Sequence, residues 1–78
     1  MPTILRIGPY RFFFNSREEP RLHVHVASPE GVAKYWLEPE IELANVYNLK
    51  SKELGKLEAL VREHADEFKA AWQRHFGQ

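Results

Sequence analysis

The chain has 78 residues, no cysteine, and 11 basic against 11 acidic side chains, so its formal net charge is zero. This size predicts a single domain over residues 1–78, and the lack of cysteine excludes a disulfide framework. The charge balance argues against a protein that binds nucleic acid through its net charge. The sequence shows neither a signal-peptide pattern nor a run of about 20 apolar residues, so we expect a cytoplasmic protein with no membrane partner.

Short apolar and aromatic segments predict strands over residues 3–47. The first two segments are separated only by Gly8-Pro9, a turn signal, and therefore predict a hairpin. The last segment is also compatible with irregular structure or a single helical turn. The segments are residues 3–8, 10–16, 22–28, 32–38 and 40–47.

Residues 51–76 predict one amphipathic helix, because apolar side chains recur there every three or four residues and Ser51 is a suitable N-cap. The predicted fold class is therefore α+β: an antiparallel meander of four to five short strands, followed by one long C-terminal helix packed on one face. Such a helix is about 39 Å long, longer than the strands can cover. We therefore expect Trp72 and Phe76 to extend past the sheet.

The stretch "HVHV" at residues 23–26 places both histidines on one face of a strand and both valines on the other. The helix should cover the face that carries the aromatic and aliphatic side chains. The opposite face would then be open and polar. We expect the open face to hold Arg11, His23 and His25, together with Arg6 and Lys34.

Three interpretations of this polar face stay open. His23 and His25 could serve as acid and base beside Arg11, with Arg6, Arg11 and Lys34 holding phosphate, as in a metal-independent enzyme acting on RNA. The two histidines could instead bind a metal ion, although no third ligand lies at a diagnostic spacing. They could also be surface histidines bonded to neighbouring groups. We expect no cofactor.

Several segments in order resemble the bacterial family called domain of unknown function 4160: "MPTILRIG", "YRFFF", "HVHV", "AKYWLEP", "ELA" and a terminal helix ending in "AWxxxFG". We associate the family with a proline just before the first histidine, whereas Pro20 here stands three residues earlier. The resemblance implies an uncharacterised cytosolic protein that is often encoded beside a second small protein, an arrangement typical of toxin–antitoxin pairs. It assigns no catalytic residue.

One function and two alternatives are therefore predicted. The first is a protein-binding component of a two-gene, toxin–antitoxin-like complex, or a self-associating protein, with Phe13, Trp72 and Phe76 as the partner surface. The alternative is the RNA-acting enzyme, with His23, His25 and Arg11 as its catalytic residues. A protein that binds metal through His23 and His25 is the second alternative.

Overall fold

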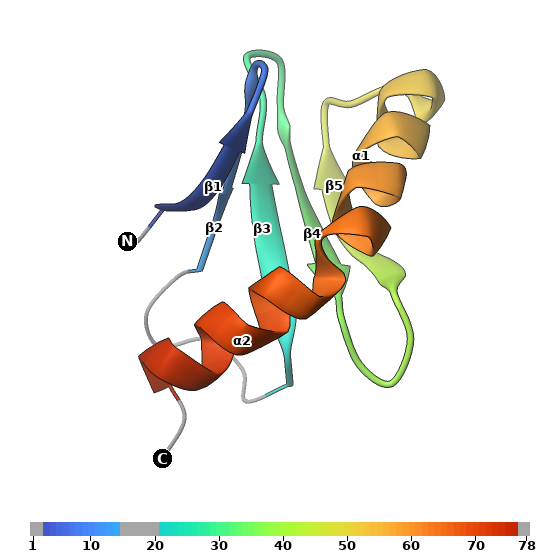
Figure 1. Ribbon diagram of the computed structural model, residues 1–78. Coiled ribbons are helices and arrows are strands. Elements are labelled where there is room, and N and C mark those ends of the chain that lie inside the picture. The colour runs from blue at the N-terminus through green and yellow to red at the C-terminus, as the bar shows by residue number, and fades with distance from the viewer. Residues whose placement is uncertain (1–2, 15–20, 77–78) are drawn as a thin grey trace.

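The structure is a computed structural model that describes residues 3–14 and 21–76 (Figure 1). Pro20 lies outside these residues. Five strands form one antiparallel sheet in the order β1-β2-β3-β4-β5, so each strand pairs with its neighbours in the sequence. The strands are β1 (Thr3–Ile7), β2 (Tyr10–Phe13), β3 (His23–Ala27), β4 (Val32–Trp36) and β5 (Glu42–Tyr47). The predicted α+β meander is confirmed, and the last segment is a strand.

Tight turns join the strands where the sequence offers glycine. Gly8 adopts a left-handed backbone conformation, with φ of 55°, between β1 and β2. In the turn before β4, the Ser28 amide donates to the Gly31 carbonyl at 2.9 Å. A Cβ at Gly31 would collide with the backbone of Tyr47 and Asn48. The absence of a side chain at Gly31 therefore lets the end of β5 approach the start of β4.

Two helices follow the sheet, α1 (Ser51–Glu63) and α2 (Ala65–Phe76). The prediction of one long helix is wrong, because the chain leaves helical geometry at His64. A straight helix would have run past the sheet, whereas the bend turns α2 across it (Figure 1). The N-cap position also differs from the prediction, since it is held by Lys50, without a side-chain hydrogen bond, and Ser51 is the first helical residue.

The core lies between the helices and one face of the sheet. Phe12 stacks on Phe68 of α2 with ring centroids 5.2 Å apart. The Tyr35 hydroxyl donates to the Leu54 carbonyl of α1 at 3.2 Å, and burial raises the pKa of Tyr35 to about 12, to which the charge of Glu58 adds. Core side chains that are at most 1% exposed are Phe12, Phe14, Val24, Val26, Tyr35, Leu37, Leu57, Val61 and Phe68.

The bend also changes the fate of the C-terminal aromatic residues. Trp72 is only 8% exposed, and it packs edge-on against Phe14 at 5.1 Å and tilted against Phe76 at 4.5 Å. The expectation that Trp72 extends past the sheet is therefore wrong. Phe76 is half-buried against the same cluster.

Candidate functional site

The face of the sheet turned away from the helices is the candidate site. Residues directly opposite one another on paired strands share a face. Phe13 pairs with His25, His25 with Lys34, and Lys34 with Asn45, so these four side chains form one row across β2, β3, β4 and β5. We call this surface the open face.

On β1 and β2, the open face carries two arginines and a phenylalanine. Arg6 pairs directly with Arg11. The Arg11 guanidinium carbon lies 4.5 Å from the centre of the Phe13 ring, and Arg11 Nη1 donates to Thr3 Oγ1 at 3.1 Å. The His25 ring stacks on Phe13 at 5.3 Å and 20°. Phe13 is therefore only 8% exposed although no helix covers it, because polar side chains lie over its ring.

Trp36 on β4 has the same kind of cover. The Arg21 guanidinium carbon lies 4.2 Å from the centre of the indole, and Lys34 Nζ lies 4.6 Å from it. Arg21 is held in place from behind, since its Nε donates to the Glu38 carbonyl at 2.9 Å and its Nη2 is 3.7 Å from Glu42 Oε1. A cation over an aromatic ring contributes about 0.5–1 kcal/mol at an exposed site. Phe13 and Trp36 are thus each covered by a guanidinium group.

His23 departs from the expected arrangement. Strand register places it beside Trp36, yet it is 0% exposed. Its ring lies 5.1 Å from His25, 5.7 Å from Trp36 and 5.1 Å from Trp72 of α2. Its Nδ1 donates to the Arg21 carbonyl at 2.6 Å, because a carbonyl can only accept. The expectation of two exposed imidazoles therefore holds for the half-exposed His25 and fails for His23, which lies where α2 reaches the start of β3.

The other predicted residues are distributed over both sides of the molecule. Arg6, Arg11 and Lys34 lie on the open face with His25. Trp72 and Phe76, predicted as partner surface, pack with Phe14 at the end of the core. Phe13, the third residue predicted as partner surface, shares the open face with His25, whereas Trp72 and Phe76 do not.

The apolar surface of β5 was not predicted. Three side chains of this edge strand and one of β4 are exposed: Val32 at 46%, Leu43 at 41%, Val46 at 40% and Tyr47 at 71%. Leu43 and Val46 pair with core residues of β4 and so point to the helix side, whereas Tyr47 pairs with Val32 on the open face. Apolar letters on both faces of the final strand were the available signal.

A shallow hollow of about 270 Å³ lies between this edge and the row of side chains that includes His25. Phe13, His25 and Lys34 line one side of it, and Asn45 and Tyr47 line the other. The Asn45 side chain is anchored there, because its Oδ1 accepts from the Val46 amide at 3.0 Å. A polypeptide segment bound along β5 would therefore contact both the exposed apolar side chains of this strand and the side chains of His25 and Lys34.

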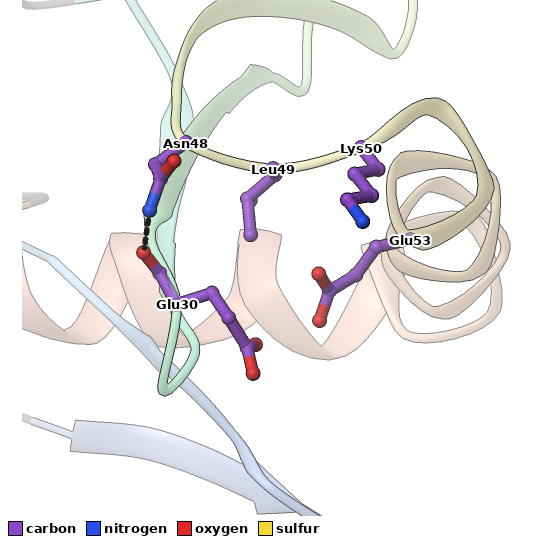
Figure 2. A pocket seen from close by; sticks show the side chains of 5 residues that line it. All are labelled: Glu30, Asn48, Leu49, Lys50 and Glu53. Atoms are coloured by element: carbon purple, nitrogen blue, oxygen red, sulfur yellow. Dashed lines mark hydrogen bonds between the residues drawn. The ribbon is translucent and has the colours of Figure 1, made fainter.

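A second hollow, of about 480 Å³, lies between the turn before β4 and the start of α1. Glu30, Lys50 and Glu53 line it, and at one side of it Asn48 Nδ2 donates to the Glu30 backbone carbonyl at 2.6 Å (Figure 2). Tyr10 donates to Glu53 Oε2 at 3.2 Å. Burial raises the pKa of Tyr10, and the hydrogen bond to Glu53 raises it further. Contacts in this region join the strands to the helix.

Among residues 3–14 and 21–76, no group of three or more histidine, aspartate or glutamate side chains is placed to hold a metal ion. Of the helices in the same ranges, neither has the length and apolar character needed to cross a membrane.

Comparison with known proteins gives a family and no closer relative. No curated protein and no solved structure matches the chain. The family model described as domain of unknown function DUF4160 matches residues 10–73, a range that includes β2 to β5, α1 and most of α2. The chain therefore belongs to the DUF4160 family.

Proposed function

We propose that this protein is the binding component of a small, two-gene, toxin–antitoxin-like complex, and that its partner docks along the outer edge of β5. The observation that supports this most is the exposure of apolar side chains on both faces of that edge strand. We also propose a cytoplasmic location, supported by the lack of cysteine.

The outer edge of a sheet presents backbone donors and acceptors that can pair with another strand. At β5, Leu43 and Val46 add apolar contacts on one face, and Tyr47 adds them on the other. A strand added here would hydrogen-bond to the β5 backbone and cover side chains on both faces, as in recognition by strand addition.

The opposite edge of the sheet differs. On β1, Ile4, Leu5 and Ile7 are partly buried and pack against the core. A partner would therefore gain less apolar burial at β1 than at β5. The irregularity in the β4–β5 register and the bond from the Val46 amide to Asn45 limit pairing at β5, as natural edge strands do to prevent aggregation. Because these features limit pairing with an arbitrary strand, docking at β5 favours a partner whose shape matches this edge.

Co-expression with the product of the neighbouring small gene tests this proposal. Light scattering after size exclusion should show one heteromeric complex. Val46→Lys combined with Tyr47→Ser should abolish it, and Ala59→Lys on the exposed side of α1 is the matched control that should retain it. Circular dichroism would establish that each variant is folded. The proposal would be contradicted if the complex still formed with the Val46→Lys, Tyr47→Ser protein, or if it were lost with Ala59→Lys. A particle that contains only this chain would also contradict it.

An enzyme acting on RNA is the alternative proposal. Its support is the position of His25 between Arg11 and Lys34 on the open face. With His23 buried, His25 would have to act as a single acid–base group. If purified protein cleaves RNA, and His25→Ala removes that cleavage while the fold persists, the enzyme replaces the binding module.

A further inference from the structure

We propose that the open face binds single-stranded nucleic acid, with nucleobases stacking on the guanidinium groups of Arg11 and Arg21. This goes beyond the β5 docking proposal, and it concerns the open face, which the alternative RNA-acting enzyme would also use. It rests on how these two side chains are held and on the charge around them.

Each guanidinium already has an aromatic ring behind it. Arg11 lies over Phe13 at 4.5 Å, and Arg21 lies over Trp36 at 4.2 Å. A planar guanidinium backed by a ring on one side can take a second planar group on the other. Unpaired bases are recognised in this way on aromatic side chains and on arginine planes. The open face thus offers two such places, one over β2 and one over β4.

Hydrogen bonds hold both groups in place. Arg11 Nη1 donates to Thr3, and Arg21 Nε donates to the Glu38 carbonyl. Arginine side chains lose considerable rotamer freedom when a ligand immobilises them, so a group that is already held binds at lower entropic cost. Two arginines held in this way suit recognition of a flat ligand better than two mobile arginines would.

The surrounding charge complements a phosphate backbone. Lys34 on β4 is in direct register with His25 on β3, and Arg6 on β1 lies directly beside Arg11. Among the described residues, Glu42 is the carboxylate that strand register places on this face, and Arg21 lies 3.7 Å from it. Among the described strand residues of this face, the cations Arg6, Arg11 and Lys34 therefore outnumber the carboxylate of Glu42.

Anisotropy of a fluorescent 12-nucleotide oligomer measures the binding, with oligouridine, oligoadenine and the equivalent DNA as separate probes. With about three phosphates contacted, the affinity should fall roughly 10- to 20-fold between 50 and 200 mM salt. Arg11→Lys with Arg21→Lys keeps both charges and removes both planes, and should weaken binding about 10-fold or more. Arg62→Lys with Arg74→Lys, on the helices, is the matched control and should stay within about twofold of the parent protein.

Three results would overturn the proposal: no binding at low salt, full affinity in the Arg11→Lys, Arg21→Lys protein, or equal competition by a polyglutamate peptide, which would make the face a site for acidic protein. Binding of the RNA probes alone would name RNA as the ligand, and equal binding of DNA would extend the site to both. Val46→Lys should leave oligonucleotide binding intact, so failure at the β5 edge and failure here give different results.

Discussion

The two faces of the sheet carry aromatic rings that are covered in different ways. Phe12 and Tyr35 face the helices, where Phe68 and the α1 backbone pack on them. Phe13 and Trp36 face the other way and are covered by Arg11 and Arg21. Burial against helices stabilises the fold, whereas Arg11 and Arg21 lie on the outer side of the sheet. We therefore expect the first face to provide most of the stability, and we propose the second as a binding surface.

Replacing neighbouring phenylalanines compares the two faces at constant chemistry. Phe12→Ala should lower the free energy of unfolding by about 3–5 kcal/mol, because it removes a fully buried ring and leaves a cavity. Phe13→Ala should lower it by only about 1–2 kcal/mol, because Arg11 and His25 can close over the gap. Urea denaturation followed by circular dichroism measures both. Equal losses would mean that Phe13 belongs to the core as much as Phe12 does.

Two glycines compare the β4–β5 edge with the exposed side of α1. Gly31→Ala should destabilise the protein by about 1–3 kcal/mol, because the new Cβ collides with the backbone of Tyr47 and Asn48. Gly55→Ala should stabilise it by about 0.5–1 kcal/mol, because an added Cβ meets nothing within 4 Å and alanine favours the helix. Thermal unfolding would show shifts of opposite sign. A stabilising Gly31→Ala would contradict the close approach of β5 to the turn.

The smallest expected change in stability at neutral pH comes from the hydroxyl of Tyr35, on the face of the sheet that the helices cover. Burial raises the pKa of Tyr35 to about 12, so the folded protein holds this proton more tightly than the unfolded chain, where the pKa is about 10. The stabilisation from this group is therefore fully present below about pH 10, and the free energy of unfolding should fall as pH rises from about 10 to about 12. Tyr35→Phe should show a shallower fall over the same window. An identical pH profile in the variant would mean that helix α1 does not bury this hydroxyl.

Much of the fold was accessible from alternation along the strands. Because side chains alternate strictly, placing Phe12 and Val24 in the core also placed Arg11 and His25 on the open face. The position of His23 was not accessible, because its burial depends on α2 crossing the start of β3. The apolar spacing of three or four residues continues through the bend at His64. Helical periodicity therefore does not reveal that the helix axis changes direction there.

The candidate site was accessible only in part. The basic residues of the open face follow from alternation. The cover of Trp36 by a guanidinium group does not follow from alternation, because Arg21 lies outside the strands and contacts Trp36 only in the folded chain. The exposed edge at β5 depends on how far α1 extends over the sheet, which the strand sequence does not encode.

NMR spectra of the ¹⁵N-labelled chain, recorded as its neighbouring gene product is added, give the sharpest test of docking at β5. The largest amide shift changes should fall in Glu42–Tyr47 and in the adjoining residues of β4. Changes confined to the exposed side of α1 and α2, with β5 unaffected, would show that the partner binds elsewhere.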